Sequence, residues 1–209
     1  YQATYGKPCT VLMNVPYYTP ASFHPTPPNR IRLIHHGAAM PGRNLEILIE
    51  TLALTKPAFE LHFMLTQSDT RYFNRLQKMA EKKTPGRVFF HPTVPLAEIV
   101  NTINQYDIGI HLLPAHNFNN ANALPNKFFE FMMAGLAVAI GPSPAMARIV
   151  TDYRCGVVSP DFCPQTMAQT LNELTPEQID RMKHQALQAA KVFNYERERE
   201  QLKMIVTEL

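Results

Sequence analysis

The apolar positions of residues 124–141, LPNKFFEFMMAGLAVAIG, follow a helical period and then a continuous run. At 100° per residue, the apolar side chains of the first half cover an arc roughly 200° wide. These side chains are Phe128, Phe129, Phe131, Met132 and Met133. Gly135 suits the left-handed residue that ends a helix, and residues 136–140 have the pattern of a buried strand. The stretch therefore predicts a mostly buried helix followed directly by a core strand.

A narrow polar strip remains on this predicted helix, and Glu130 lies on it together with Asn126 and Lys127. Burying a carboxylate without a partner is costly. Glu130 is therefore either paired with Lys127, three residues away, or it faces a cleft and holds a polar ligand. The helix by itself leaves both alternatives open.

The rest of the chain alternates between patterns typical of strands and patterns typical of helices. A short strand is expected at residues 10–15, and five prolines then make residues 16–28 extended, as in a connector between domains. Further strands are expected at residues 31–36, 60–65, 87–90, 107–113 and 156–158, and helices at residues 44–55, 68–82, 96–104 and 145–150. This order predicts an α/β fold, a Rossmann-like parallel sheet with helices on both faces.

Two finer expectations concern the ends of these elements. Ser68 is expected to cap the helix at residues 68–82, and residues 114–123 are expected to form a polar loop. The C-terminus is helical, with helices at residues 163–174, after Thr175, and at residues 195–209. Thr175 and Gln178 have the spacing of a capping box, with Pro176 in the first turn.

Composition narrows the class of protein. The 209 residues are 45% hydrophobic and 18% charged, which is ordinary for a soluble globular protein with a sizeable core. No apolar run approaches the roughly 18 residues of a membrane span, and no signal-peptide pattern opens the chain. We therefore expect a cytoplasmic protein, and because the chain begins with Tyr1, we expect a fragment of a longer one.

The net charge and the possible metal-ligating residues do little to define the ligand or partner. The net charge of +3 permits an anionic ligand or a membrane surface, but no basic run with interleaved aromatic residues indicates nucleic acid. Cys9, Cys155 and Cys163 are odd in number and lack metal-ligand spacing, so they are expected to be idle thiols in a reducing compartment. His35 and His36, beside a strand end, are expected to serve packing or loop polarity rather than a metal.

Two predicted loops follow strands and therefore lie where open α/β sheets bind ligands. One contains Gly37 and Gly42, which permit close backbone approach, and Arg43, which can contact phosphate oxygens in a bidentate manner. The other, at residues 117–125, leads into the helix that carries Glu130, whose free N-terminal amides attract an anion. A phosphate between these amides and Arg43, with Glu130 accepting two vicinal hydroxyls, describes a sugar nucleotide.

These segments resemble a known family. PNKFFEFMMAGLAVAIG resembles the ribose-binding helix of retaining GT-B glycosyltransferases (group 1, family 4-like), and HHGAAMPGRNLEILIETL resembles their first loop and helix, with Arg43 at the phosphate-binding position. VFFHPTVPLAEIVNTINQYDIGIHLLP resembles the segment that lies near the base and leads to the sugar pocket. The similarity is collinear over residues 31–158.

The resemblance implies the donor-binding C-terminal domain of a GT-B fold. Residues 1–30 would be the end of a missing N-terminal acceptor domain plus a Pro-rich connector, residues 31–193 the nucleotide-sugar-binding domain, and residues 194–209 a C-terminal helix. Arg43 and Glu130 would be catalytic as well as substrate-binding. The other substrate-binding residues that the resemblance implies are Gly37, Val94, Asn122, Leu124, Asn126 and Lys127.

The resemblance also implies the reaction partners. The donor would be a UDP- or GDP-linked sugar, and the acceptor a glycan or a lipid-linked molecule bound by the missing half, as in polysaccharide biosynthesis. No separate cofactor and no metal site are implied. A peripheral contact of the full-length protein with the inner membrane surface is compatible with such an acceptor.

Three positions depart from the family pattern. Asn122 stands where the family often has the first of two glutamates, Ala38 stands in place of an arginine, and Arg148 stands in place of an acidic residue. Arg43 is then the only cation of the usual pair. An asparagine can hydrogen-bond a sugar hydroxyl but cannot stabilise positive charge at the anomeric carbon, so the identity of the sugar is left open.

Other functions are compatible with the same architecture. A nucleotide-sugar epimerase would share the fold, and a flavodoxin-like regulatory or scaffold module would have crevice polar residues engaged only with one another. Lys127 would either reach the phosphate or pair with Glu130.

Overall fold

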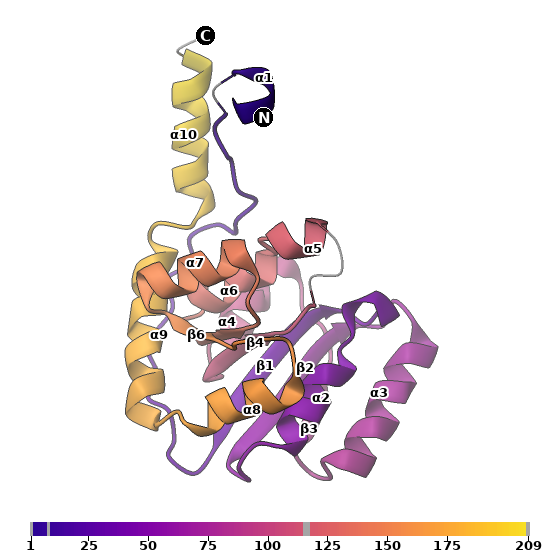
Figure 1. Cartoon of the computed structure of the whole chain (residues 1–209). Coiled ribbons are helices and arrows are strands. Elements are labelled where there is room, and N and C mark those ends of the chain that lie inside the picture. Colours follow the sequence, from indigo (N-terminus) through magenta and orange to yellow (C-terminus); the bar gives the residue numbers. More distant parts are fainter. Residues whose placement is uncertain (1, 8, 115–117, 208–209) are drawn as a thin grey trace.

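In the computed structural model, which describes residues 2–7, 9–114 and 118–207, the strands form one parallel sheet. The strands are β1 (Ile31–Ala38), β2 (Phe59–Thr66), β3 (Val88–His91), β4 (Ile108–His111), β5 (Ala137–Ile140) and β6 (Gly156–Val158). Their spatial order is β3-β2-β1-β4-β5-β6, the order of dinucleotide-binding Rossmann folds (Figure 1). The predicted parallel α/β sheet is confirmed.

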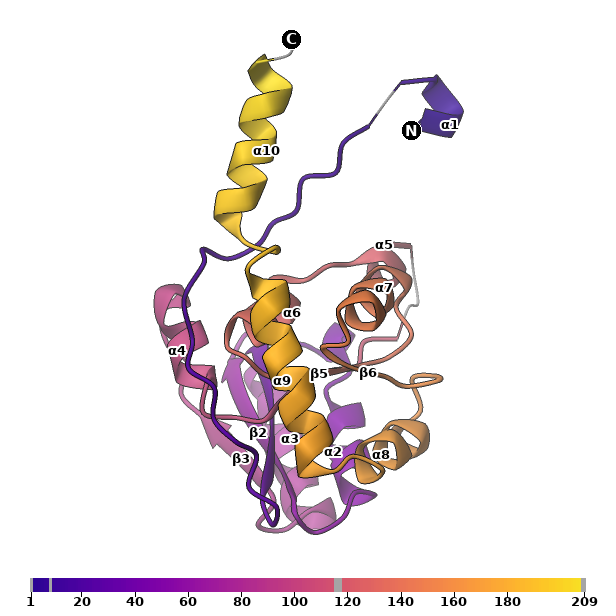
Figure 2. The same ribbon diagram turned by 90° about the vertical axis from the view of Figure 1, so that its left-hand side faces the viewer.

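Helices cover both faces of this sheet (Figures 1 and 2). One hydrophobic cluster lies under α2 (Glu46–Ala53), α3 (Thr70–Lys83) and α8 (Pro164–Asn172). A second cluster lies under α4 (Ile99–Ile103), α6 (Asn126–Met133), α7 (Pro144–Tyr153) and α9 (Pro176–Ala190). The nearly unbroken apolar pattern of β1, β2, β4 and β5 follows from this arrangement, because these inner strands are covered on both faces, whereas the edge strands β3 and β6 are only partly buried.

The α6–β5 unit is the centre of the second cluster. All five apolar residues of the predicted arc are buried, and Gly135, with a φ of 69°, ends the helix as expected. Phe131 packs directly on β4 at Gly109, where a Cβ atom would lie 2.1 Å from the ring. A side chain at position 109 would therefore displace the helix that carries Glu130.

The prediction of a strand at residues 10–15 is wrong. These residues carry no helix or strand, and the Met13 amide donates to the Glu198 carboxylate at 2.8 Å instead of to a neighbouring strand. The pattern of this segment resembles that of a strand, but both edges of the sheet lie elsewhere. A strand needs a partner, and residues 10–15 have none within the described part of the chain.

Smaller differences lie at the ends of elements. Asp69, not Ser68, caps α3, because the Asp69 carboxylate accepts from the Tyr72 amide at 2.9 Å. The predicted loop 114–123 includes a short helix, α5 (Phe118–Asn122), while its residues 115–117 lie outside the described residues. The 3₁₀ helix η2 (Leu96–Glu98) precedes α4. The capping box of Thr175 and Gln178 is confirmed.

Residues 16–30 cross the outside of the domain along α4 and α9 (Figure 2). Their backbone is hydrogen-bonded to side chains of these helices: the Ser22 carbonyl accepts from Asn104, and the Thr26 amide donates to Asp180. The His24 carbonyl accepts from the Lys183 ammonium at 2.5 Å. The connector is therefore fixed to the domain along its length.

A buried ion pair lies beneath this connector. Lys183 is 1% exposed, and its Nζ is 3.3 Å from Oδ1 of Asp107, which is fully buried. The other carboxylate oxygen of Asp107 accepts from the Arg32 amide at 2.8 Å. The pair joins β1, the start of β4, α9 and the connector.

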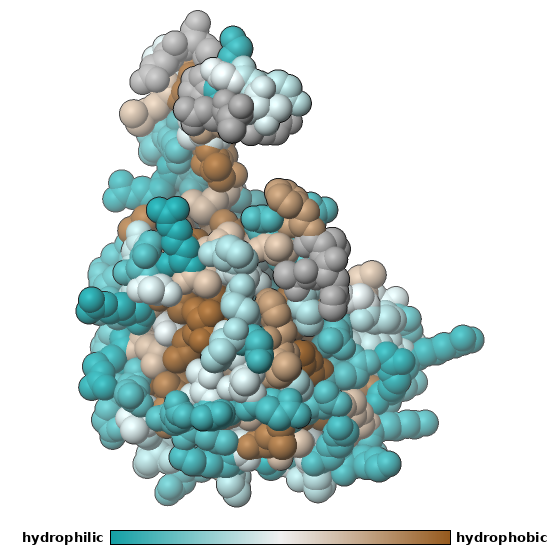
Figure 3. Space-filling model, viewed as in Figure 1, coloured by the Kyte–Doolittle hydropathy of each residue, from teal (hydrophilic) through white to brown (hydrophobic). Residues whose placement is uncertain are grey.

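The last helix, α10 (Tyr195–Thr207), and the N-terminal segment with α1 (Gln2–Tyr5) project from the same end of the domain (Figure 1), and Figure 2 shows that they diverge away from it. The Tyr195 amide donates to the Pro16 carbonyl where the two segments leave the domain. Met204 and Val206 of α10 are both 63% exposed. Figure 3 shows further apolar side chains between α7 and α8 on an otherwise hydrophilic face. No helix in the described ranges is long and apolar enough to cross a membrane.

Candidate functional site

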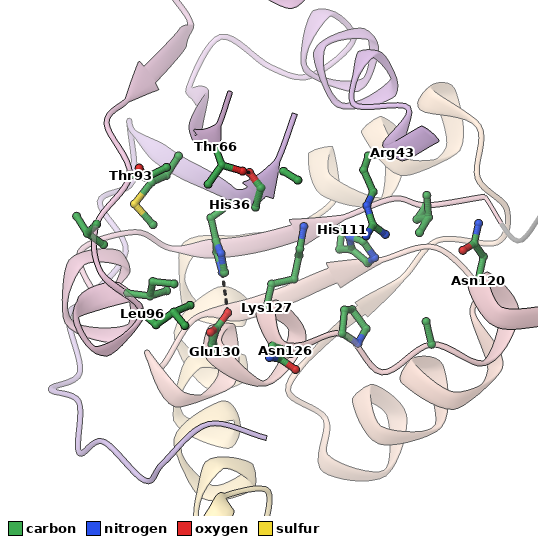
Figure 4. A pocket seen from close by; sticks show the side chains of 18 residues that line it. His36, Arg43, Thr66, Thr93, Leu96, His111, Asn120, Asn126, Lys127 and Glu130 are labelled. Atoms are coloured by element: carbon green, nitrogen blue, oxygen red, sulfur yellow. Dashed lines mark hydrogen bonds and ion pairs between the residues drawn. The ribbon is translucent and has the colours of Figure 1, made fainter. Parts of the chain in front are cut away.

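A pocket of about 350 Å³ lies at the carboxyl ends of β1 and β4 (Figure 4). These strands are neighbours in the sheet but not in the chain, so helices leave them towards opposite faces and open a crevice there. The predicted site residues that line the pocket are Gly37, Arg43, Val94, Asn126, Lys127 and Glu130. The structure thus brings together six residues from four separate segments.

Two predicted residues lie outside the wall of this pocket. Asn122 is exposed, and its amide donates to the Phe118 carbonyl at 2.9 Å within α5. Leu124 packs against the second hydrophobic cluster. Neither is brought to Glu130 in this structure, and the roles that the resemblance implies for them stay predictions.

Several residues that line the pocket were not predicted from the sequence. His36 lies directly before Gly37 near the end of β1, and His111 is the last residue of β4. Both therefore lie at the carboxyl edge of the sheet. The rule that ligands bind beyond this edge would have selected them. Thr66, the last residue of β2, and Thr93, two residues after β3, also line the pocket at this edge.

Glu130 faces the pocket and is not paired with Lys127. Its side chain is 10% exposed, and its Oε2 is 3.3 Å from Nε2 of His36, without hydrogen-bond alignment (Figure 4). Burial, together with the charge of Lys127, lowers the pKa of His36 to about 3, so this imidazole is neutral. Burial also raises the pKa of the Glu130 carboxyl. The carboxylate is therefore held without a charged partner in contact, as a ligand-binding group would be.

Lys127 contacts a histidine instead. Its Nζ is 3.1 Å from Nε2 of His35, which lies below the pocket on β1. Gly37, with a φ of 126°, provides the necessary space, because a Cβ atom there would lie 2.8 Å from Nζ. The close approach of Lys127 to the strand thus depends on a glycine at position 37.

The positive groups gather at one side of the pocket. Arg43, at the end of the 3₁₀ helix η1 (Pro41–Arg43), is exposed, and its guanidinium makes no hydrogen bond or ion pair with another described residue. Burial and then the charge of Arg43 lower the pKa of Lys127 to about 7. Both His35 and His111 have pKa values well below the usual one, chiefly through burial and then through Lys127.

The two sides of the pocket suit different parts of one ligand. Arg43 and Lys127 are cations with no carboxylate in contact, and no side chain caps the start of α6, so an anion fits there. Glu130 lies one turn further along α6 and can accept hydroxyl protons. Val94, Leu96 and Ile99 add an apolar wall that can hold a flat ring. In the described ranges, no group of three His, Cys, Asp or Glu side chains is arranged to hold a metal ion.

The fold and the pocket define an α/β domain with a pocket at the point where the strand order of its parallel sheet reverses, the usual ligand site of such sheets. Residues 30–176 match the family model of glycosyl transferases group 1, and the chain belongs to this family. No curated protein sequence matches significantly.

Solved structures share the fold. HepE from Anabaena, in complex with UDP and glucose, has 17% sequence identity and a TM-score of 0.70, and the match covers 87% of this chain and 49% of HepE. The C-terminal domain of the group 1 glycosyl transferase LpcC from Francisella tularensis has 15% identity and a TM-score of 0.64, over 84% of this chain and 94% of that domain. WaaG, a glycosyltransferase involved in lipopolysaccharide biosynthesis, has 17% identity and a TM-score of 0.61, and the match covers 85% of this chain and 47% of WaaG. The expected GT-B C-terminal fold is confirmed, and the chain spans about half the length of HepE.

Proposed function

We propose that this chain is the donor-binding half of a retaining glycosyltransferase whose donor is a nucleotide diphosphate sugar. The observation that carries the proposal is the pairing, in one pocket, of two cations without a carboxylate in contact and a buried carboxylate one helical turn away. The diphosphate binds to Arg43, Lys127 and the first amides of α6. Glu130 accepts the two ribose hydroxyls, and the base lies against the apolar wall.

In this assignment the protein stabilises the leaving group. Negative charge develops on the departing diphosphate as the bond to the sugar breaks, and Arg43 and Lys127 lie where this charge appears. One such preorganised donor is typically worth on the order of 10²–10³ in rate. The acceptor, a glycan or a lipid-linked molecule, binds to a preceding domain, of which residues 1–30 are the end plus the Pro-rich connector, while residues 31–193 bind the donor and residues 194–209 form the C-terminal helix. The match of this chain to 49% of HepE, whose structure contains UDP and glucose, supports this arrangement.

Titration calorimetry with UDP, GDP and their sugars tests the proposal. We expect at least one of them to bind with a dissociation constant between micromolar and millimolar. Because the chain spans about half the length of HepE, we expect no efficient transfer by this chain alone. Arg43→Ala should weaken this binding by about tenfold, the lower end for a charged hydrogen bond, because Arg43 is exposed to competing water. If none of the nucleotides binds at millimolar concentration, a scaffold module is supported instead. Efficient sugar transfer by this chain alone would contradict the assignment of donor and acceptor binding to separate domains.

Glu130→Gln separates a ligand-binding carboxylate from a structural one. The amide keeps the size of the side chain but loses the charge that strengthens the bonds from two hydroxyls, so nucleotide affinity should fall by about tenfold. The free energy of unfolding should stay within about 1 kcal/mol or rise, because the buried carboxylate has no charged partner in contact to lose. Urea melts and titrations on the same protein measure both quantities. A destabilisation of about 3–5 kcal/mol, typical of a broken buried pair, would remove Glu130 from the site.

A further inference from the structure

His35 has both ring nitrogens engaged, in a way that defines its tautomer. It is 2% exposed on the central strand β1, and its Nδ1 is 2.8 Å from the Ile110 carbonyl oxygen of β4. A carbonyl can only accept, so Nδ1 carries the proton. Nε2 is then a bare acceptor, and it lies 3.1 Å from Nζ of Lys127.

This contact orients the lysine without neutralising it. A carboxylate in the same position would form an ion pair with Lys127 and cancel its charge, whereas a neutral imidazole accepts one hydrogen bond and leaves the positive charge in place. The His111 ring, parallel to His35 at 5.8 Å, supports the ring from β4. A histidine that served packing alone would not need its second nitrogen on the ammonium of a pocket residue.

We propose that His35 is a positioning residue that holds the Lys127 ammonium on the floor of the pocket, charged and available to an anionic diphosphate. The inference rests on the proposed function for the identity of the anion, but the contact itself does not depend on it. His35 touches no ligand, and it acts through Lys127. Gly37 is also required for this contact, because a Cβ atom at position 37 would collide with Nζ of Lys127 beside the strand.

The groups that face Lys127 define how the contact depends on pH. They are Arg43 from η1, His35 and His36 from β1, His111 from β4 and Glu130 from α6. The histidines are neutral above their lowered pKa values, so Arg43 and Glu130 are the only charges among these groups near neutral pH. Affinity for an anion should therefore fall as pH rises through about 7, where Lys127 loses its proton.

Three substitutions of His35 separate its effect on the position of the Lys127 ammonium from its effect on the charge of that group. Glutamine places an amide oxygen near the position of Nε2, glutamate places a charged oxygen there, and phenylalanine keeps the ring but removes the acceptor. With inorganic pyrophosphate and UDP as probes, His35→Phe should bind about tenfold more weakly, as expected for a lost constraint on a charged hydrogen bond. His35→Gln should recover affinity to within about threefold, and His35→Glu should be at least about tenfold weaker than Gln because it neutralises the ammonium. His62→Phe, a buried histidine replaced on the adjacent strand β2 outside the pocket wall, is the matched control and should bind as the parent does.

A second measurement needs no ligand. NMR of the labelled lysine side chain should give a Lys127 titration midpoint that moves to lower pH in His35→Phe and to higher pH in His35→Glu. Parent-like binding and an unchanged midpoint in both variants would overturn the proposal. If His35→Phe does not fold, equal affinity of the Gln and Glu variants would overturn it. If the parent binds neither nucleotide nor pyrophosphate, the proposed function fails, and the midpoints still decide the role of His35.

Discussion

Replacing Asp107 with asparagine is expected to lower the free energy of unfolding by about 3–5 kcal/mol, the usual cost of breaking a buried ion pair from one side. Asp107 is fully buried, and the change leaves the Lys183 ammonium, itself 1% exposed, without its counter-charge. The Arg32 amide and guanidinium, both within 3.3 Å of the same carboxylate, lose a charged acceptor as well. Urea melts followed by circular dichroism measure the difference.

Two further variants show whether the cause is the pair itself. The double change Asp107→Asn with Lys183→Met removes both charges, and most of the lost stability should return. Asp152→Asn breaks the pair of Asp152 with Arg148, whose side chains are 59% and 84% exposed, and should cost less than about 0.5 kcal/mol. A loss below about 1 kcal/mol in Asp107→Asn would show that water reaches the pair.

The second large effect is expected for Lys127→Met, in opposite directions for binding and stability. Loss of the ammonium should weaken nucleoside diphosphate binding by roughly ten- to a hundredfold, because a charged hydrogen bond contributes about 1.5–3 kcal/mol. The folded protein should at the same time become more stable near and below pH 7. Methionine fills the space of the lysine without the cost of burying a charge and without placing a second positive charge near Arg43.

The sign follows from proton binding. Burial and Arg43 lower the pKa of Lys127 in the folded state from 10.5 to about 7, so the unfolded chain holds more protons between these values. The stability of the parent protein therefore rises with pH across this range. The gain from Lys127→Met should be complete below about pH 7 and should disappear towards pH 10.5. Lys78→Met, at an exposed position on α3, is the control, and a gain independent of pH would contradict the explanation.

Much of the fold could be predicted because it depends on local periodicity. The helix and strand at residues 124–141 and the capping box of Thr175 are specified by neighbours within a few residues, and both were found. The strand expected at residues 10–15 depends on a partner far away in the chain, which the local pattern does not report. The cap of α3 was misplaced by one residue because Ser68 and Asp69 are both good caps.

The functional site was likewise predictable in some parts and not in others. Arg43, Lys127 and Glu130 could be placed in one pocket because the rule for carboxyl ends of parallel strands applies to any doubly wound sheet. The protein partners of Lys127 and Glu130 could not be predicted, because spacing along α6 offered each of them only the other or a ligand. The residues that they actually contact, His35 and His36, come from β1, about 90 positions earlier, and only the assembled sheet brings them together.

The connector has a practical consequence for recombinant work on this domain. The family match begins at residue 30 and β1 at residue 31, so a boundary there would be chosen from the sequence. A protein cut at that point would expose the surface of α9 that residues 16–30 cover, and Lys183 would lose the His24 carbonyl. The Asp180 carboxylate would lose the Thr26 amide as well. The smallest piece that keeps these bonds starts no later than Pro16, whose carbonyl also anchors the start of α10.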